Sequence, residues 1–291
     1  MKKVIILNPV FNDWKSVNKL YAEISRQISA LKQFEFSLIL VNDASTETEY
    51  TLHKPHNIKS LTILNMRENR SHQRCIAAGL KYIMQNINFD YVVVMDADGE
   101  DRPEEIVMLL DKMGANSQFP VVAKRVKRSE GLMFRILYQI HKIITYIFTG
   151  KIMNFGNFVC LTKDNVSKII NEKSLWNNFS GTIRNKFKKL ESINCIRGNR
   201  YFGPSKMSFL KLFIHSMSII SVFNKVVYLR SILYLATAFL LELFFSLNIF
   251  KSFLILLLFF NLIIFFSSQR SNAEGLNTAL DNIRDAKSDI H

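Results

Sequence analysis

The sequence predicts an α/β domain with a parallel sheet, followed by a pair of membrane-spanning helices. Short β-branched runs alternate with helical patterns through residues 2–122, an acidic loop separates one such run from a capped helix, and two long apolar runs lie near the C-terminus. Alternating strands and helices are typical of parallel sheets with crossover helices. The 291 residues suffice for one large domain with an appendage or for two ordinary domains.

Five segments carry the strand pattern: residues 3–7, 36–41, 61–64, 91–95 and 120–123. Between the first two, apolar residues recur at helical spacing, and Asn12 or Asp13 stands where the helix would begin. After the fourth segment, Asp101 and Pro103 predict the start of another helix. Residues 96–101 therefore form a strand-to-helix loop, and such loops bind ligands in open α/β sheets.

The charge and composition favour an anionic, lipid-associated partner. A formal net charge of +14 allows nucleic acid, acidic lipid headgroups or phosphorylated substrates. The 24 Phe gather toward the C-terminal third, and the basic residues lack the aromatic interleaving of a single-strand platform, so nucleic acid is not an expected partner. The three cysteines, Cys75, Cys160 and Cys195, have no metal-ligand spacing and are expected to stay reduced.

Two helical segments are apolar on most sides and predict interfacial amphipathic helices. They are residues 131–149 and 207–228, and each keeps a narrow polar stripe. Packing of both helices on a soluble core is the alternative. Their proximity to the apolar runs that follow favours the membrane surface.

The runs 231–250 and 252–268 are each long enough to cross a bilayer, which needs about 20 apolar residues. A buried helical hairpin is the alternative. Basic residues flank the pair, which predicts both flanks, and hence both termini, on the cytoplasmic side. The N-terminal apolar run stops at Asn8, too short for a signal peptide. Glu242, inside the first span, is either a helix-packing partner or a residue near the headgroups.

The loop after the fourth predicted strand holds four acidic residues, Asp96, Asp98, Glu100 and Asp101. Carboxylates this close repel each other unless a cation lies among them. Oxygen ligands suit Mg²⁺ or Mn²⁺, which typically also bind substrate phosphates. The sequence therefore predicts a divalent-cation site at this loop.

Two further polar loops follow strands and are expected at the same edge of the sheet. One contains Asn42, Asp43, Ser45 and Thr46, where a carboxylate can accept hydrogen bonds from a nucleobase or ribose. A plain Asx turn is the alternative. The other loop follows the first strand and contains Pro9, Phe11, Asn12 and Asp13.

Six motifs, in order along the chain, resemble those of family 2 glycosyltransferases. They are NPVFND, VNDAST, MRENRSHQRCIAAGL, VVVMDADGEDRPEEI, FGNFVCLTKDNV and GNRYFGPSKMSFLKL. The likeness covers almost the whole chain and is greatest to the polyprenyl-phosphate branch, which includes dolichyl-phosphate mannose synthase and bacterial undecaprenyl-phosphate glycosyltransferases.

The resemblance implies a GT-A (Rossmann-like) catalytic domain over residues 1–206. A juxtamembrane amphipathic helix at 207–228, two transmembrane helices within 229–268 and a cytoplasmic tail at 269–291 would follow it. The implied reaction is metal-dependent, inverting transfer of a sugar from a nucleotide-sugar donor to a polyprenyl phosphate at the cytoplasmic membrane face, with Mg²⁺ or Mn²⁺. A homo-oligomer is compatible with two spans.

The resemblance also implies roles for individual residues. The nucleotide-sugar set is Pro9, Phe11, Asp13, Asp43, Asp96 and Arg125. The metal set is Asp96, Asp98 and Glu100, with Glu100 standing where relatives often have glutamine. The catalytic set is Asp98, Arg125, Asn157, Arg200 and Lys206. The acceptor-phosphate set is Arg200, Ser205 and Lys206.

Asn157 departs from the family pattern, because several relatives carry an aspartate there that is proposed as catalytic base. Asparagine cannot take a proton, and a phosphate acceptor, already ionised near neutral pH, needs no base. His72 is the nearest alternative titratable group. Two other functions stay open, namely transfer to a saccharide of a surface glycan and a catalytically silent membrane scaffold. The sequence identifies neither the sugar nor the nucleotide.

Overall fold

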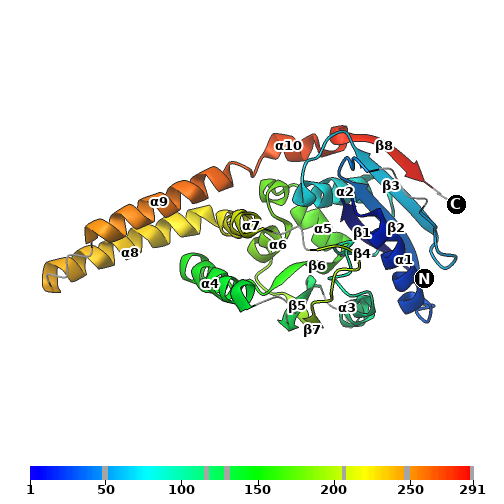
Figure 1. Cartoon of the computed structure of the whole chain (residues 1–291), viewed down its shortest axis with the longest axis horizontal. Coiled ribbons are helices and arrows are strands. Elements are labelled where there is room, and N and C mark those ends of the chain that lie inside the picture. Colours follow the sequence, from blue (N-terminus) through cyan, green and yellow to red (C-terminus); the bar gives the residue numbers. More distant parts are fainter. Residues whose placement is uncertain (48–51, 115–117, 128–131, 205–207, 246–249, 289–291) are drawn as a thin grey trace.

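The computed structural model describes residues 1–47, 52–114, 118–127, 132–204, 208–245 and 250–288 (Figure 1). A mixed sheet forms the centre of the domain, with the strand order β7-β5-β6-β4-β1-β2-β3-β8. The strands are β1 (Lys2–Val10), β2 (Phe34–Asn42), β3 (Ser60–Met66), β4 (Tyr91–Val94), β5 (Val121–Lys127), β6 (Phe155–Thr162), β7 (Glu191–Ile196) and β8 (Ile283–Ser288).

Ten α-helices and two short 3₁₀ helices occur in the described residues. The helices are α1 (Trp14–Ile28), α2 (His72–Asn86), α3 (Glu104–Gly114), α4 (Leu132–Thr149), α5 (Lys163–Ile169), α6 (Phe179–Lys186), α7 (Phe209–Ser221), α8 (Asn224–Phe245), α9 (Phe250–Ser268) and α10 (Ala273–Asn277), with 3₁₀ helices η1 (Lys173–Trp176) and η2 (Ala279–Asn282).

The predicted α/β class is confirmed, and all five predicted strands are present. Strands β1 to β4 pair in parallel, as expected from the crossover pattern. The sheet is not wholly parallel, because β6 lies between β4 and β5 and runs antiparallel to both. Strands β6, β7 and β8 have no counterpart among the sequence predictions.

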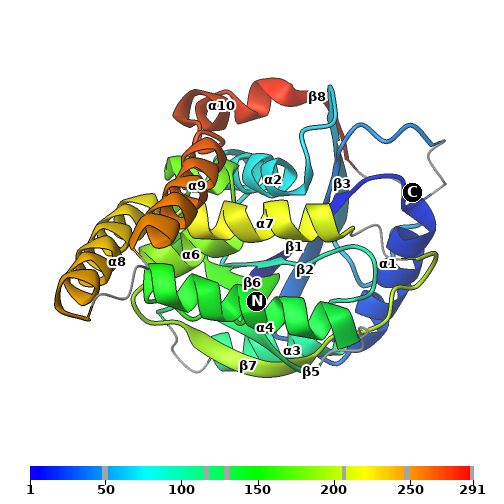
Figure 2. The same cartoon turned by 60° about the vertical axis from the view of Figure 1, so that its left-hand side comes forward.

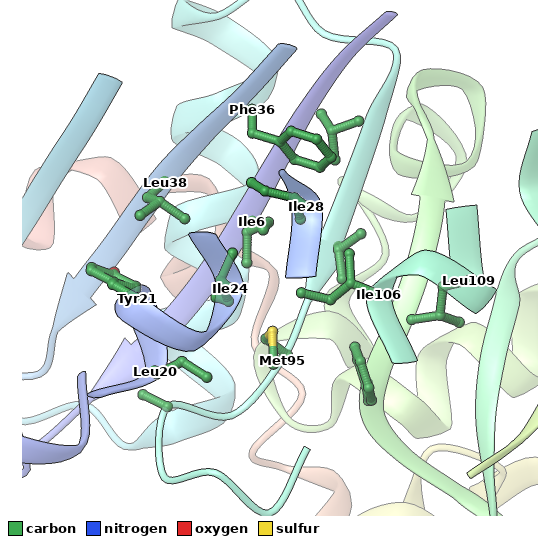
Figure 3. Close-up of a cluster of buried hydrophobic side chains, with 14 of the residues drawn as sticks. Ile6, Leu20, Tyr21, Ile24, Ile28, Phe36, Leu38, Met95, Ile106 and Leu109 are labelled. Carbon is green, nitrogen blue, oxygen red and sulfur yellow. The ribbon is translucent and has the colours of Figure 1, made fainter. Parts of the chain in front are cut away.

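Helices cover both faces of the sheet, and alternation along the strands divides the core in two. Val4 and Ile6 face the layer that holds α1 and α3, whereas Ile5 and Leu7 face the layer that holds α2, α5 and α6. Figure 3 shows the first layer, in which residues of α1 and α3 meet those of β1 and β2. Burying each such side chain stabilises the fold by about 1.5–3 kcal/mol, so the central strands are held rigidly from both sides.

Helices α4 and α7 lie beside the root of the α8–α9 hairpin (Figure 2), and their apolar sides are exposed. In α7 the buried hydroxyl of Ser218 bonds to Asn177 and Asn178, so the polar side faces the domain. The outward side chains are large and apolar: Ile136, Ile140, Ile143, Tyr146 and Ile147 of α4, and Phe209, Leu210, Phe213 and Ile214 of α7. This is the reverse of a soluble surface helix and suits the interfacial placement expected from the sequence.

The segment 207–228, predicted as one amphipathic helix, is divided. Helix α7 ends at Ser221, and α8 begins at Asn224 and continues into the first apolar run. Val222 and Phe223, between them, are buried against residues of α9. The segment contains neither glycine nor proline, so the sequence gives no local signal for this break.

Helices α8 and α9 run side by side and extend away from the sheet domain (Figure 1). Both are long and apolar enough to cross a membrane, and in their most apolar windows only 17% and 11% of residues are buried. The hairpin is therefore not packed inside the core of this chain, which favours the membrane-spanning alternative. Their root is fixed by the amide of Asn177, which donates to Ser221 Oγ at 3.0 Å and to the Ser267 carbonyl at 3.2 Å.

Residues 269–291 were expected as a tail, but the described part of this segment returns to the sheet. Helix α10 packs on η1, and β8 pairs antiparallel with β3 as the outermost strand. The chain thus enters and leaves the hairpin from the same domain. The domain was expected to end at residue 206, and that boundary leaves out β8, which belongs to the same sheet.

Candidate active site

The acidic loop after β4 is balanced by four basic side chains from three other segments. Each carboxylate has its own basic partner: Asp96 with His72 at 3.0 Å, Asp98 with Arg200 at 2.6 Å, Asp101 with Arg125 at 3.1 Å, and Glu100 with Arg197. These partners come from α2, β5 and the loop after β7. The structure therefore brings together residues far apart in the sequence around one loop at the carboxyl end of β4.

Asp96 lies in a polar network with His72 and Asn157. Its Oδ1 accepts from Asn157 Nδ2 at 3.3 Å, and that nitrogen also lies 3.0 Å from His72 Nε2. Burial raises the pKa of Asp96, but the charge and hydrogen bond of His72 outweigh it and lower the pKa overall. Burial lowers the pKa of His72, yet the Asp96 charge raises it above its usual value. Each partner therefore favours the ionised form of the other.

Asn157 is fixed on both sides. Its Oδ1 accepts from Gln73 Nε2 at 3.3 Å, and Gln73 Oε1 accepts from the backbone N–H of Phe179, at the start of α6, at 2.7 Å. These contacts orient the amide so that it presents its nitrogen to Asp96. An aspartate at this position would place a second negative charge against Asp96, so the pair of Asn157 and His72 suits the network as found.

Asp98 is held by Arg200, which also binds Asp13 at the start of α1. Burial and the charge of Asp96 raise the pKa of Asp98 to about 6, even with Arg200 present. The neighbouring Gly99 has φ +90°, and a Cβ there would lie 2.7 Å from the Tyr201 ring. The loop after β7 thus closes tightly over the acidic loop.

Asp101, expected at the start of the helix after β4, makes its hydrogen bonds within the acidic loop and to β5. It is 3% exposed, its Oδ2 accepts from the Asp96 backbone N–H at 3.0 Å, and its Oδ1 accepts from Arg125. Burial, followed by the charge of Asp96, raises the pKa of Asp101 to about 6. Arg125, predicted to bind donor phosphate, is therefore anchored by Asp101 within the same site.

The two polar loops that are expected to bind the donor, here called the donor loops, follow β1 and β2. Pro9 is buried in β1 opposite Val41, and Phe11 is 41% exposed. Asp43, predicted to contact the nucleoside, is 4% exposed, and its two carboxylate oxygens accept from the backbone N–H groups of Arg70 and Ser71 at 2.7 and 3.0 Å. Asp43 thus ties the β2 loop to the start of α2.

Asn12 joins the same two donor loops. Its backbone N–H donates to Ser45 Oγ at 2.9 Å, and its Oδ1 accepts from the backbone N–H of Thr46. Ser205 and Lys206, predicted to contact the acceptor phosphate, lie outside the described residues.

The chemistry of the acidic loop fits a cation that arrives with its phosphates. Among the described residues, no group of three or more His, Cys, Asp or Glu side chains could hold a metal by itself. Mg²⁺ is usually bound by one or two carboxylates together with substrate phosphates. Burial and the charge of Asp96 together raise the pKa of Asp98, and a divalent cation would relieve the repulsion between the two carboxylates. Glu100, the third expected ligand, is engaged by Arg197.

Sequence comparison decides the family. Residues 5–202, more than half of the chain, match the model of "Glycosyl transferase family 2". The chain belongs to glycosyl transferase family 2. This glycosyltransferase is similar to the undecaprenyl-phosphate 4-deoxy-4-formamido-L-arabinose transferases of Photorhabdus laumondii and Proteus mirabilis. They are 28% and 30% identical to it over 226 residues, with 73% of this chain covered in each case.

The glycosyltransferase spans about 65% of the length of these two relatives. The predicted resemblance to polyprenyl-phosphate glycosyltransferases is confirmed. The fold of this glycosyltransferase is also similar to that of a solved glucosyl-3-phosphoglycerate synthase from Mycobacterium tuberculosis in complex with Mn²⁺, UDP-glucose and phosphoglyceric acid. The TM-score is 0.56 at 12% identity, and 78% of this chain and 80% of that one are covered. The predicted GT-A fold is confirmed on this likeness.

Proposed function

We propose that this glycosyltransferase transfers a sugar from a nucleotide diphosphate sugar to a polyprenyl phosphate, with inversion at the anomeric carbon. The observation that carries this proposal is the amide at position 157. Asn157 donates to Asp96 and accepts from Gln73, so it cannot serve as a base. His72 is paired with Asp96 in the charged form that its raised pKa favours. An acceptor that is already an anion, such as a lipid phosphate, needs no proton removed.

The donor would lie between the loops that follow β1, β2 and β4. Phe11 is exposed there, and Asp13 is held by Arg200 beside Asp98. A nucleoside placed along Pro9, Phe11 and Asp13, with Asp43 holding the loop behind it, would direct its diphosphate toward Asp96 and Asp98. Open α/β sheets bind ligands at such strand ends.

Asp96 and Asp98 would hold a divalent cation with the donor diphosphate, with Glu100 at the margin of the site. When bound, Mg²⁺ or Mn²⁺ would stabilise the negative charge that develops on the departing nucleoside diphosphate. Arg125, anchored by Asp101, supplies a guanidinium able to bind phosphate oxygens with two hydrogen bonds. Arg200, Ser205 and Lys206 would contact the acceptor phosphate from the loop after β7.

The membrane-facing surfaces would bring the lipid acceptor to this site. The exposed apolar sides of α4 and α7 would enter the interface, and α8 and α9 would span the bilayer with the sheet domain on the cytoplasmic side. Lys225 and Arg230, before the first apolar run, and Arg270, after the second, fit this orientation. Since both ends of the hairpin join the sheet domain, both termini would lie on the same side.

Solvent partition of the product tests the proposal. Purified protein in lipid, Mn²⁺, polyprenyl phosphate and radiolabelled nucleotide sugars should give label that extracts into organic solvent. Asp98→Ala should abolish transfer, whereas Asp111→Ala, at an exposed position in α3, should retain it. Label that stays in water and requires an added saccharide would instead support a saccharide acceptor. Nucleotide binding without turnover of any donor would contradict an enzymatic role.

A further inference from the structure

The strand that follows the membrane hairpin is connected to the donor loops by side chains. In the sheet, Asn42 of β2 lies opposite Asn65 of β3, and Asn65 lies opposite Asp285 of β8. Side chains directly opposite one another on neighbouring strands share a face and interact. These three polar residues therefore form one row across the edge of the sheet.

Hydrogen bonds run along the whole row. Asn65 Nδ2 donates to Asp285 Oδ1 at 2.6 Å, and Asn42 Nδ2 donates to Asn65 Oδ1 at 2.8 Å. Asn42 Oδ1 then accepts from the backbone N–H of Ser45 at 3.0 Å. Asn65 is 2% exposed and Asn42 is 8% exposed, so water cannot readily replace the bond between them, whereas Asp285 on the edge strand is partly exposed.

The carboxylate of Asp285 sets the direction of this row. An ionised carboxylate only accepts hydrogen bonds, so Asn65 must turn its nitrogen toward Asp285 and its oxygen toward Asn42. Asn42 must then point its own nitrogen at Asn65, which leaves its oxygen to accept from Ser45. Reversing either amide would place two donors or two acceptors against each other inside the sheet.

The loop at the end of the row has a conformation that needs such support. Ala44 has φ +54° and Asn12 has φ +49°, both in the left-handed region, which alanine rarely adopts and asparagine tolerates better. Ser45 joins the two positions, because its N–H is held by Asn42 and its Oγ accepts from the N–H of Asn12. Asn12 lies between Phe11 and Asp13, which the proposed function places against the nucleoside.

We propose that Asp285 is a positioning residue for the donor site, acting through Asn65 and Asn42 on the loops that hold the nucleoside. The inference rests on the proposed role of those loops in donor binding. On this inference, β8 supports the donor site instead of forming a tail. Donor affinity then depends on the pairing of β8 with β3, which occurs only after the chain has formed α8 and α9.

Substitutions along the row test the inference with the intact protein in lipid. The donor is whichever of the uridine, guanosine or thymidine diphosphate sugars the wild-type protein turns over. Asp285→Ala removes the acceptor of Asn65 Nδ2, whereas Asn65→Asp places two carboxylates against each other. Each should raise the donor KM by on the order of tenfold, the scale of one lost hydrogen bond, and leave kcat within about twofold. Titration with the matching nucleoside diphosphate should show the same loss of affinity.

The double variant Asn65→Asp with Asp285→Asn gives the sharpest outcome. The carboxylate placed at position 65 accepts from Asn42 and from the amide placed at position 285, so Asn42 keeps its orientation and the donor KM should return to within about threefold of wild type. Ser288→Ala is the matched control, since it removes only the 3.4 Å contact of β8 with Thr62. It should leave KM unchanged.

Three results would overturn the inference. If the wild type turns over a donor but neither single variant changes KM, Asp285 does not position the donor loops, and the proposed function survives. Equal losses in Ser288→Ala, with a matching drop in melting temperature, would mean that β8 acts only by packing. A wild-type protein that neither binds nor turns over any of the nucleotide sugars would overturn the proposed function together with the inference.

Discussion

Arg200 Nη1 lies 2.6 Å from Asp98 Oδ2, and the second terminal nitrogen of Arg200 binds Asp13. The guanidinium thus joins the loop after β7 to the acidic loop and to the start of α1. Its Nε is buried and has no hydrogen-bond partner among the residues that the structure describes. Because Asp98 is the expected metal ligand, a cation and its diphosphate would have to take over a carboxylate that Arg200 now neutralises.

Removing Arg200 should therefore strengthen metal binding in the absence of nucleotide. In Arg200→Gln, Asp13 and Asp98 lose their counter-charge, so Mn²⁺ should raise the melting temperature by more than it does in the wild type. Differential scanning fluorimetry with and without Mn²⁺ measures this difference. Arg26→Gln, which breaks an exposed pair with Glu23, is the control. Equal Mn²⁺ shifts in all three proteins would show that Arg200 and the metal do not compete.

Much of this arrangement follows from local sequence patterns. The strand ending at Val94, the acidic residues after it and the helix opened near Glu104 are adjacent in the chain, so periodicity and capping signals place them together. The apolar helices are also predictable from local sequence, because each is longer and more apolar than most helices of soluble proteins. Such features depend on short stretches of sequence and are therefore predictable.

The basic partners of the acidic loop are a different case. Arg200 and Asp98 are 102 residues apart, and Asn65 and Asp285 are 220 apart. No periodicity indicates which arginine meets which carboxylate, because the pairing depends on how β7 and β8 join the sheet. The segment of β8, Ile283–Ser288, alternates weakly and has mostly exposed side chains, so it resembles a solvated tail. Pairing with β3 makes it a strand.

Loss of Asp101 should lower the stability of the fold in addition to any effect on catalysis. Asp101 is buried and paired with Arg125, and removing one partner of a buried ion pair costs about 3–5 kcal/mol. Asp101→Ala should therefore lower the melting temperature clearly. Glu104→Ala, which breaks a more exposed pair with Arg102, should cost no more than about 1 kcal/mol. Similar melting temperatures for the two variants would contradict a structural role for Asp101.

His215 of α7 should make the protein sensitive to acid. Burial, followed by the charge of His72 and, more weakly, those of Arg125 and Arg270, lowers the pKa of His215 to about 4, while Asp96 opposes the shift. The unfolded chain takes up this proton near pH 6.5, but the folded chain does not. Above pH 6.5 His215 is neutral in both states and leaves the free energy of unfolding unchanged. Between pH 6.5 and 4 that free energy falls by at most about 3 kcal/mol.

Melting temperatures measured from pH 7 to pH 4.5 test this dependence. His215→Gln should lose less stability on acidification than the wild type, because the variant has no proton to exclude. His56→Gln, at an exposed position, should follow the wild-type curve. Parallel curves for the wild type and His215→Gln would show that another group controls the acid response.

Glu242 should stabilise the hairpin through a hydrogen bond at its far end. Its Oε2 accepts from the backbone N–H of Phe250 at 2.7 Å, so a carboxylate on α8 caps the first turn of α9. Losing such a cap costs about 1–2 kcal/mol. Glu242→Ala should lower the melting temperature in detergent and leave donor KM unchanged, whereas Glu242→Gln, which keeps an acceptor oxygen, should stay close to wild type. If Glu242→Gln lost as much stability as Glu242→Ala, the negative charge rather than the cap would be what stabilises the hairpin.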